Sequence, residues 1–568
     1  MHRLAASALA LTLTATGVTV GIATPAAAQP SVAIDFAGTA PTPAPAVPGA
    51  RIGGQITWLQ EFAPAHLDPQ QIYDVIELST QLFHRTLTGY IEDPAGGQPR
   101  LVGDLATNAG ESSDGGKVWT YHLRPGVSFE DGTPITSRDI AYGIARSFSE
   151  QGTFGPHYVQ AALDPSGAYT GPYTGSTVPP GISLPDDQTL VFTFAQPHPE
   201  LPYLAAFPTT TPVPQAQDTR ENYDLTFLSS GPYRRIAENP GVSLTLGRNP
   251  NWNPASDPIR HQYADAIHFD WTASRDDQTS RVIAGAGSDA AAVMTSNVSA
   301  DQIPVVQADP ALAARVLAGP TPLAKYINVN TSRVTDVAVR KALNWAFDRG
   351  ALVTAQGGST VAAPLTTILA PTVPGWLDYD AYPSDGHGNV QAAKRLLSGR
   401  KPTLAYCFPD TADDAAQAAV VKSGLQRAGF RITLTPVDAT AYWGVIGGPG
   451  NTCDLMYSAW IADFPDASST LGTLLHGGSL GGEFSVNFSQ FNEPCINARL
   501  DELAAMTDRS AAATQYELLD KRIMTDFAPL IPTVSAHAFL LHGPAVGGVF
   551  LSGLFGRPNL TGAYVLTG

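Results

Sequence analysis

The chain has 568 residues, enough for three or four packed units, and 43% of them are apolar, which excludes a generally disordered protein. Only 15% are charged, whereas 53 glycines and 47 prolines predict many turns and long loops. With 33 basic against 50 acidic residues the net charge is −17, which argues against a non-specific nucleic-acid binder.

Residues 1–28 have the pattern of a secretory signal peptide. His2 and Arg3 precede an apolar run that begins at Leu4, and three alanines end the segment. A short basic start, an apolar middle and small residues at the cleavage point are typical of such signals. The alternative is an uncleaved membrane anchor, which the alanine- and threonine-rich run and the A-x-A site disfavour. Since no cysteine follows the cleavage point near Ala28, we expect a secreted or periplasmic chain without a lipid anchor.

Residues 29–50 are rich in proline and alanine without helical or strand periodicity, so we predict a semi-extended linker before a folded part that begins at about Arg51. From there short strand patterns alternate with helical patterns, and no internal repeat is visible. Strands are predicted at 52–59, 118–125, 189–195, 242–248 and 326–330, and helices at 137–148, 337–352, 415–429 and 496–506. Strands and helices that intermix throughout predict an α/β chain of several lobes.

Six sequence blocks occur in an order that is specific for one family. They are residues 101–148, which begin with LVGDLATNAG and have LDPQ ahead of them at 67–70, SGPYRRIAENPGVSLTLGRNPNW (230–252), YINVNTSRVTDVAVRKALNWAFDR (326–349), AAKRLL (392–397), DLMYSAWIADFPDAS (454–468) and FAPLIPT (527–533). Together they resemble the extracellular solute-binding proteins of the peptide/nickel type, family 5, which deliver ligands to ABC importers. The resemblance covers nearly the whole mature chain.

The resemblance implies an α/β periplasmic-binding-protein fold of type II, with two lobes and a ligand cleft between them. Mapped block by block, lobe one comprises about 51–320 and 536–568, with a small subdomain at about 93–185, and lobe two comprises about 321–535. The ligand then selects the closed form through contacts with both lobes. We expect a monomer without a cofactor, whose partners are a small peptide or peptide-like ligand and an ABC-transporter permease, with neither nucleic acid nor stable membrane insertion.

In peptide-binding members of that family, the aspartate of a W-x-x-D motif pairs with the ligand's α-amino group. Residues 460–463 match the motif, so the resemblance assigns Asp463 to a ligand ammonium. The alternative is that Asp463 or Asp466 caps the helix that starts near Ala467. Asp466 is nearer to that start, which leaves Asp463 for the ligand. A carboxylate buried on lobe closure is costly unless paired, so it selects a cationic group.

The other predicted ligand contacts lie on the same strand and on a facing segment. The backbone of residues 458–460, opposite residues 60–65, is expected to offer strand-like hydrogen bonds to an extended ligand. Aromatic rings nearby are candidates for stacking or cation–π contact, although such residues more often belong to a core. The predicted ligand-binding residues are Phe62, Tyr457, Ser458, Ala459, Trp460, Asp463 and Phe464.

One departure from the family bears on the charge of the ligand. Oligopeptide-binding members hold the ligand's carboxylate with arginine and histidine around this strand, whereas residues 432–498 contain six acidic residues, one histidine and no lysine or arginine. This half of the cleft is therefore a poor receptor for a free carboxylate. Ligands that are amidated, blocked or cationic fit it better, as do ligands held at their acid end by the other lobe.

The three cysteines predict one disulfide, because an odd number in an oxidising compartment leaves one thiol unpaired. Cys453 and Cys495 each stand at the start of an element in neighbouring segments, whereas Cys407 lies inside the predicted strand TLAYCF. We therefore predict a disulfide between Cys453 and Cys495, and a buried thiol at Cys407.

A second function class is a binding-protein scaffold recruited as a secreted enzyme or an extracellular sensor. Residues 477–481 match the G-x-S-x-G pattern of a hydrolase nucleophile elbow, with Ser479 at the centre. That elbow requires a strand directly before the serine, whereas the preceding TLGTLLHGG is typical of a helix, so we predict no enzyme. No CxxC, HExxH or Walker A motif occurs, so nothing in the sequence marks a metal centre or ATP hydrolysis.

Overall fold

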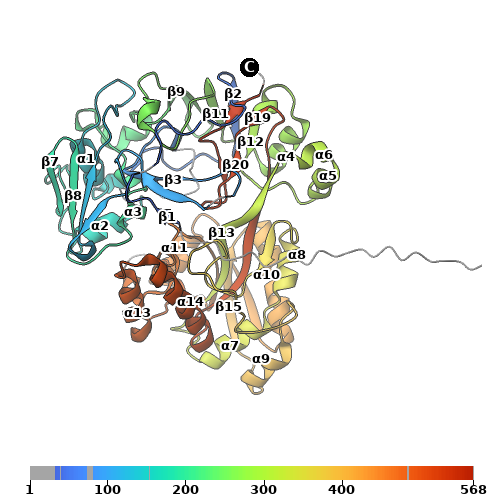
Figure 1. The fold of residues 1–568 in the computed structure, drawn as a ribbon. Helices are drawn as coiled ribbons and strands as arrows, with labels where there is room; N and C mark the ends of the chain where they lie inside the picture. The colour runs from blue at the N-terminus through green and yellow to red at the C-terminus, as the bar shows by residue number, and fades with distance from the viewer. Residues whose placement is uncertain are drawn as a thin grey trace, which may run out of the picture.

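The computed structural model describes residues 32–38, 40–72, 81–96, 98–152, 154–482 and 485–566. The predicted signal peptide lies outside these ranges. Figure 1 shows two lobes joined by a pair of long strands, β13 (Val316–Val329) and β18 (Leu530–Leu541), which agrees with the predicted two-lobed α/β fold. Within the described part of the chain, no helix has the length and apolar character needed to cross a membrane.

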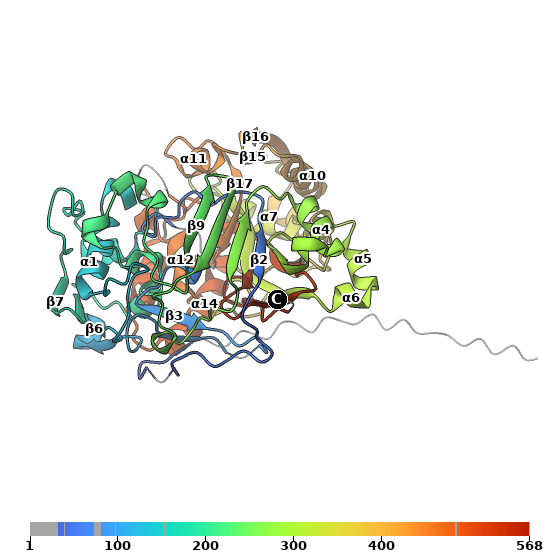
Figure 2. The same ribbon diagram turned by 90° about the horizontal axis from the view of Figure 1, so that it is seen from above.

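The first lobe is built on a five-stranded sheet in the order β12-β2-β11-β10-β9. The interior strand β2 pairs in parallel with both β11 and β12, and its residues Ile56, Trp58 and Leu59 are buried. The strands are β2 (Gln55–Leu59), β9 (Tyr233–Asn239), β10 (Ser243–Arg248), β11 (Ala266–Asp270) and β12 (Ala292–Met294). Helices α4 (Arg275–Ala284), α5 (Ile303–Ala308) and α6 (Pro310–Ala313) lie at one end of this lobe (Figure 2).

A four-stranded antiparallel sheet, β5-β6-β8-β7, lies with α1 at the opposite end of the first lobe (Figure 2). It packs with a three-stranded sheet, β1-β4-β3, around one hydrophobic core that includes Tyr121, Phe129 and Phe192. The strands are β1 (Ala33–Ile34), β3 (Thr88–Ile91), β4 (Arg100–Gly103), β5 (Glu111–Ser113), β6 (Val118–His122), β7 (Ile182–Asp186) and β8 (Thr189–Thr193). The helices are α1 (Ser137–Arg146), α2 (Tyr158–Leu163) and α3 (Leu201–Leu204).

The second lobe is built on a six-stranded sheet in the order β14-β18-β13-β17-β15-β16. Its strands are β13 (Val316–Val329), β14 (Ala362–Pro364), β15 (Thr403–Pro409), β16 (Arg431–Val437), β17 (Leu455–Ile461) and β18 (Leu530–Leu541). Its helices are α7 (Val337–Ala346), α8 (Arg349–Ala355), α9 (Val390–Leu397), α10 (Ala412–Arg427), α11 (Tyr442–Gly447), α12 (Ser468–Leu475), α13 (Pro494–Ala504) and α14 (Arg509–Asp526).

Two hydrophobic cores cover the two faces of this sheet, because successive residues of a strand point to opposite faces. On β13, Ala324 and Tyr326 belong to the core made with α12, α13 and α14, whereas Ile327 and Val329 belong to the core made with α7 to α10. The same alternation decides which side chains of β13 and β17 reach the space between the lobes.

Strands β13 and β18 carry the chain from the first lobe to the second and back (Figure 1). Their antiparallel register shifts between Pro320 and Ala324. Proline has no N–H for the ladder, so the prolines at 320 and 322 account for the break. The predicted lobe boundaries, 320/321 and 535/536, fall in this stretch, and the exact division of the chain remains a prediction.

The final strands of the chain return to the first lobe. Strand β19 (Val546–Gly547) pairs with β22 (Tyr564–Val565), and β20 (Phe550–Leu551) pairs with β21 (Pro558–Asn559). Val546, Leu560 and Val565 join the core of the five-stranded sheet. The C-terminal segment therefore belongs structurally to the lobe in which the described chain begins.

Most predicted elements are present with ends that differ by a few residues, and two elements differ more. The predicted helix at 337–352 is two helices, because Asp348 leaves the helix and accepts a hydrogen bond from the backbone N–H of Ala351 (2.9 Å) at the start of α8. The predicted strand at 326–330 is only the end of β13, which begins at Val316. The proline- and glycine-containing first half of β13 carries no strand signal of its own.

Part of the predicted linker is packed against the first lobe. Strand β1 pairs in parallel with β4, and Val32, Ala40 and Ala44 are buried. An extended chain offers its backbone groups to a sheet edge, and alanine fits where little space remains, so this segment is ordered without periodicity. The folded part therefore begins before Arg51.

The disulfide prediction is wrong. Cys407 pairs with Cys453, with their Cα atoms 5.9 Å apart, and Cys495 is an exposed cysteine outside the disulfide. Strand β15 is the parallel neighbour of β17, and Cys407 lies opposite Met456 in their register. This pairing brings Cys453, just before β17, next to Cys407, whereas Cys495 lies on α13.

Candidate ligand-binding site

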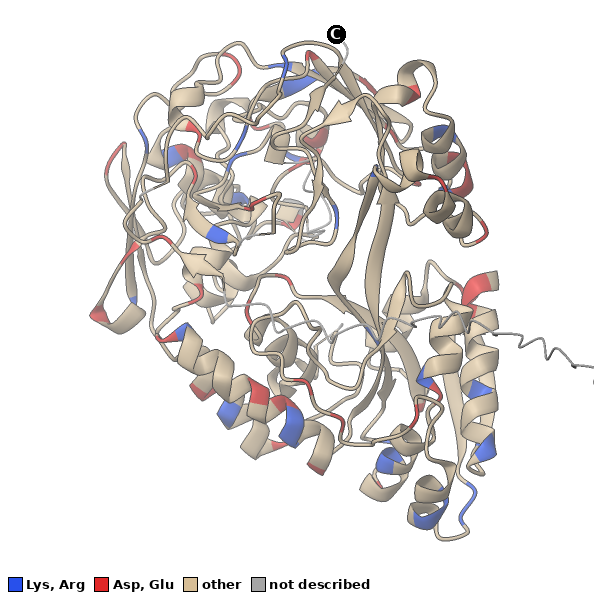
Figure 3. Cartoon of the chain, turned by 45° about the vertical axis from the view of Figure 1, so that its right-hand side comes forward, with Lys and Arg blue, Asp and Glu red and all other residues tan. Residues whose placement is uncertain are grey.

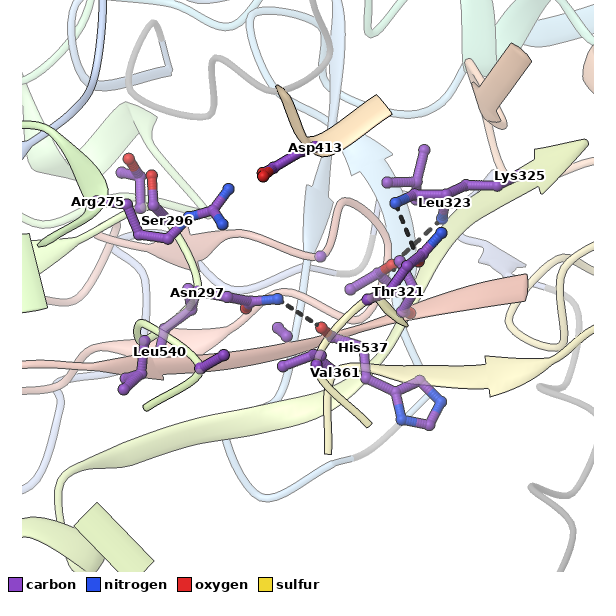
Figure 4. A pocket seen from close by; sticks show the side chains of 18 of the residues that line it. Arg275, Ser296, Asn297, Thr321, Leu323, Lys325, Val361, Asp413, His537 and Leu540 are labelled. Atoms are coloured by element: carbon purple, nitrogen blue, oxygen red, sulfur yellow. Dashed lines mark hydrogen bonds between the residues drawn. The ribbon is translucent and has the colours of Figure 1, made fainter. Parts of the chain in front are cut away.

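A cavity of about 680 Å³ lies between the two lobes, beside the hinge strands, and we call it the hinge cavity. Its walls come from the first lobe (residues 295–298 and Arg275), from the second lobe (residues 354–357 and Asp413, Ala416 and Gln417) and from β13 and β18. Figure 4 shows side chains from these elements directed into one space. A ligand in this cavity therefore contacts both lobes at once.

The alternation of β13 and β17 selects the side chains that reach the hinge cavity. Thr321, Leu323 and Lys325 of β13 line it, as does Ile461 of β17, which pairs with Leu323. Ala459 lies opposite Lys325 in the same register. The residues between them point to the other face, into the core with α12 to α14.

Lys325 is a cation on the hinge strand β13. Its Nζ donates a hydrogen bond to Oε1 of Gln356 (3.2 Å), and it forms no ion pair with any carboxylate in the described ranges. Burial lowers the pKa of Lys325, Asp414 acts in the opposite direction, and the charge of Arg275 lowers it further. Figure 3 shows charged residues on the surface helices of both lobes, whereas the long strands between the lobes are almost free of them.

Arg275 extends into the hinge cavity from the first residue of α4, on the side of the first lobe (Figure 4). Its backbone N–H donates to Oε1 of Glu61 (3.1 Å), and its guanidinium has no hydrogen-bond or ion-pair partner among the described residues. Arg557, a third cation of the wall, donates from Nη1 to the carbonyl of Thr295 (2.9 Å).

Other titratable groups of the wall are Glu61, Asp413 and His537. Asp413 lies in the first turn of α10 and is exposed. Burial lowers the pKa of His537 below its ordinary value, so this imidazole is neutral at physiological pH. The wall thus combines three permanent or potential cations with two carboxylates.

The predicted strand residues are divided between the two faces of β17. Tyr457 lies beside a small cavity of about 10 Å³ that shares Gln356 and Gln417 with the hinge cavity. Ser458 is buried and accepts a hydrogen bond from Nδ2 of Asn328 (2.6 Å). None of the seven predicted ligand-binding residues lines the hinge cavity itself.

Trp460 points to the α12 side of the sheet. Its Nε1 donates to the carbonyl of Ser469 (3.2 Å), and its ring packs against the core there. Trp460 therefore has the alternative role given above for aromatic residues of this segment, which is packing in a core.

One edge of β17 is left without a neighbouring strand. Strand β15 pairs with β17 only through Leu455 and Met456, so no described strand covers this edge from Tyr457 to Ile461. The carbonyl of Tyr457 accepts a hydrogen bond from the hydroxyl of Tyr442 (2.7 Å). The remaining backbone groups of this edge are placed where an extended chain can pair with them.

Asp463 lies at a second contact between the lobes, which we call the rim contact and define by Tyr158, Asp463 and Phe464. The hydroxyl of Tyr158, on α2 of the first lobe, donates a hydrogen bond to the carboxylate of Asp463, which is only 6% exposed. Phe464 is buried in the core of the first lobe, with ring centroids 5.7 Å from Tyr158 and 5.8 Å from Tyr203.

The helix-cap role belongs to Asp466. Its Oδ1 accepts a hydrogen bond from the backbone N–H of Ser468 (2.9 Å) at the start of α12, and Nη2 of Arg509 lies 2.7 Å away. Asp463 makes its hydrogen bond across the lobes instead. Phe62 is 68% exposed, next to Glu61 of the cavity wall.

The cavity residues that sequence reasoning missed are Arg275, Lys325 and Arg557. A lysine within an apolar strand is a rare choice, so the stretch LAKYINVN contained a signal for Lys325. Arg275 and Arg557 lie on loops and helix starts far away in the sequence, and only the tertiary fold brings them to Lys325.

The G-x-S-x-G match does not form a nucleophile elbow. Ser479 lies in a short 3-10 turn after helix α12, and its Oγ donates to the carbonyl of His476 (3.1 Å). An elbow needs a strand directly before the serine, and a helix and a loop precede it here. No group of three or more potential metal-ligating side chains is found in the described ranges.

Two lobes joined by two long strands, with a cavity walled by both lobes, are the architecture of a solute-binding protein. Residues 100–482 match the model of the bacterial extracellular solute-binding proteins, family 5 (middle region). The chain belongs to this family.

Curated relatives are similar over most of their length. The periplasmic oligopeptide-binding protein OppA of Escherichia coli is 25% identical over 505 residues, which cover 85% of this chain and 87% of that protein. The probable deoxycholate-binding periplasmic protein YgiS of Escherichia coli is 25% identical over 504 residues, 85% of this chain and 88% of that protein.

Solved structures show the same fold. The clavulanic acid biosynthesis oligopeptide binding protein 2 superposes with a TM-score of 0.85 and 29% sequence identity, covering 94% of this chain and 99% of that chain. The DppA protein of Helicobacter pylori, solved with the peptide STSA, gives a TM-score of 0.71 with 18% identity, covering 91% and 99%.

Proposed function

We propose that this protein captures a peptide or peptide-like ligand between its lobes, outside the cytoplasm, and delivers it to an ABC importer. The observation that carries the proposal is the hinge cavity, whose walls come from both lobes. A ligand that contacts both lobes stabilises the closed form, which is the form a permease can distinguish from the open one. Relatives named as oligopeptide-binding proteins support the peptide class.

The size and the walls of the hinge cavity suit a short peptide. Cavities of about 300–1,000 Å³ bind small organic ligands, and 680 Å³ lies within that range. The uncovered edge of β17 ends at Ile461, which lines the cavity. An extended ligand can therefore pair with backbone groups while its side chains occupy the cavity.

The ammonium of the ligand is assigned to Asp463. This carboxylate is nearly fully buried, and the Tyr158 hydroxyl supplies one hydrogen bond to it. A carboxylate has about four acceptor sites, so a ligand ammonium adds to Tyr158 rather than replacing it. Pairing also offsets the cost of burying the charge, which favours a ligand with a cationic group.

The proposal is tested by native mass spectrometry of the purified chain mixed with an equimolar tripeptide library. We expect retained tripeptides, and a melting temperature that rises with library concentration as mass action requires. The tightest tripeptides then serve as probes for calorimetric titration. Failure to retain any tripeptide, together with an unchanged melting temperature, would overturn the peptide assignment.

A further inference from the structure

We infer that the hinge cavity binds an acidic group of the ligand between Lys325 and Arg275. This inference rests on the proposed function, because it names the chemistry that the same cavity selects. It adds a subsite for the acid end of the ligand, separate from Asp463, which the resemblance to the family marks for the ammonium end.

Lys325 has donors available for an anion in the hinge cavity. Its side chain is half-buried against the hinge strands, and Oε1 of Gln356 supplies one neutral hydrogen-bond acceptor. An ammonium has three donors, so donors remain for an oxygen that enters the cavity. A charge-assisted hydrogen bond to a carboxylate is stronger than one to a neutral amide.

Arg275 supplies the second cation from the opposite lobe. Lys325 lies on a hinge strand and Arg275 on α4, and both side chains line the same cavity. Two like charges without a described carboxylate on either side chain repel each other. An anion bound between them converts that repulsion into attraction and draws the first lobe toward the hinge strands.

The remaining charged groups around Lys325 leave this place open for an anion. Asp414 acts on Lys325 in the direction that raises its pKa, and its own carboxylate accepts a hydrogen bond from the hydroxyl of Thr411 (2.7 Å). Glu61 accepts from the backbone N–H of Arg275. The other groups of the wall are Asp413, Arg557 and His537. Three cations against two carboxylates give this cavity a positive excess in a chain whose net charge is −17.

The stretch from Ala459 on β17 to Asp463, two residues beyond the end of that strand, limits the length of ligand that reaches both subsites. Ala459 lies opposite Lys325, and Asp463 follows it four residues later. At about 3.3 Å per residue, this is at most about 13 Å of extended chain. A peptide of three or four residues has the same length, so its ammonium reaches Asp463 when its carboxylate reaches Lys325.

The experiment compares two tripeptide libraries, one with free carboxyl termini and one with amidated termini. We expect the wild-type protein to retain tripeptides of the first library more tightly than their amidated counterparts. Lys325→Gln should weaken the tightest free-acid tripeptides by roughly 30-fold or more, and should leave the amidated ones within about twofold. Lys394→Gln, on the exposed helix α9 outside the cavity, is the matched control and should change neither.

The outcomes separate this inference from the proposed function. Equal retention of both libraries, with Lys325→Gln equal to wild type, overturns the acid subsite and leaves the peptide function standing. Retention from neither library overturns both. Arg275→Gln provides a second variant, since its exposed side chain has no structural partner in the described ranges, and it should weaken free-acid binding in the same direction as Lys325→Gln.

Discussion

The two places where the lobes meet differ in how their charges are matched. At the rim contact, Tyr158 donates to Asp463, and the neighbouring Asp466 pairs with Arg509, with side chains only 7% and 10% exposed. In the hinge cavity, Lys325 and Arg275 line the same wall, and neither forms an ion pair with a described carboxylate. The rim contact already joins the lobes through groups of the protein, whereas the two cations of the hinge cavity have no carboxylate partner in the described ranges.

This difference assigns separate tasks to the two regions. Phe464 and the Tyr158 hydrogen bond stabilise contact between the lobes even without a ligand, since a buried aromatic ring and a satisfied carboxylate favour the closed arrangement. The hinge cavity has the opposite effect, because two unpaired cations resist closure. A ligand with an ammonium and an acid end therefore adds an interaction at the rim contact. In the hinge cavity, its acid end replaces the repulsion between the two cations by attraction.

Replacement of Asp463 should have the largest effect on this comparison. Asp463→Ala leaves a buried ligand ammonium without its partner, so we expect a loss of about 3–5 kcal/mol in binding free energy, roughly a hundred- to several-thousand-fold in affinity. Asp463→Asn should lose less, because an amide oxygen still accepts a hydrogen bond. Calorimetric titration of the retained tripeptides measures both variants.

The free protein provides the control for this variant. In the absence of ligand, Asp463→Ala removes the hydrogen bond from Tyr158. The free energy of unfolding of the variant should therefore fall by about 1 kcal/mol. Affinity equal to wild type would show that Asp463 serves the rim contact alone.

The disulfide should have the next largest effect, on stability rather than on selectivity. It fixes the start of β17, the strand that leads from the hinge cavity to the rim contact. Replacing both Cys407 and Cys453 by serine should lower the free energy of unfolding by about 2–4 kcal/mol in denaturant titration, because the unfolded chain gains conformational freedom.

The exposed Cys495 supplies the matched control, and Cys495→Ser should leave stability unchanged. The acid-over-amide preference of the folded double variant should persist. A stability loss in Cys495→Ser equal to that of the double variant would contradict the Cys407–Cys453 pairing.

Much of the fold can be predicted from local patterns in the sequence. The periodicity of residues 137–148 gives α1, and the six blocks in order give two lobes. The break between α7 and α8 was not predicted from the sequence, because an aspartate within a helical pattern indicates a cap only when the chain is known to turn there. The disulfide escaped because it depends on β15 lying beside β17, and strand order is not a local property.

The candidate site divides in the same way. The W-x-x-D motif led to Asp463 because its residues are adjacent in the sequence, and the structure places this aspartate between the lobes. Trp460 and Ser458 point away from the hinge cavity, which strand alternation explains once the register with β13 is known. The sequence did not predict the cavity cations, because Arg275 and Lys325 are brought to one cavity only by the tertiary fold.

A pH titration sharpens the contrast on the hinge-cavity side. Burial and Arg275 hold the pKa of Lys325 below its ordinary value of 10.5, so in the free protein Lys325 loses its proton earlier than in the unfolded chain. Between these two pKa values the unfolded state binds more protons, and the Lys325 contribution to stability rises with pH. The affinity for an acidic ligand changes with pH in the opposite direction, and falls as pH rises, because the ligand binds the protonated amine.

We therefore expect affinity for free-acid tripeptides to fall as pH rises through the lowered pKa of Lys325, by at most about tenfold, or 1.4 kcal/mol, per pH unit. Calorimetry at a series of pH values measures the slope. Lys325→Gln should abolish it, and amidated tripeptides should not show it. A slope that persists in Lys325→Gln would place the titrating group elsewhere, for example at His537 of the same wall.

The smallest expected effect belongs to Tyr158→Phe, which keeps the ring against Phe464 and removes only the hydroxyl. If the ligand ammonium and Tyr158 share the Asp463 carboxylate, the variant loses the hydrogen bond to Asp463 in the closed complex, together with the contact between the hydroxyl and Oγ1 of Thr473 (3.2 Å). Affinity should then fall by roughly 0.5–1.5 kcal/mol, about two- to tenfold. If Tyr158 instead competes with the ligand for Asp463, removing the hydroxyl frees the carboxylate, and affinity rises. Calorimetric titration of one free-acid tripeptide into both proteins decides by the sign of the change, because the aromatic packing of the rim contact is the same in each.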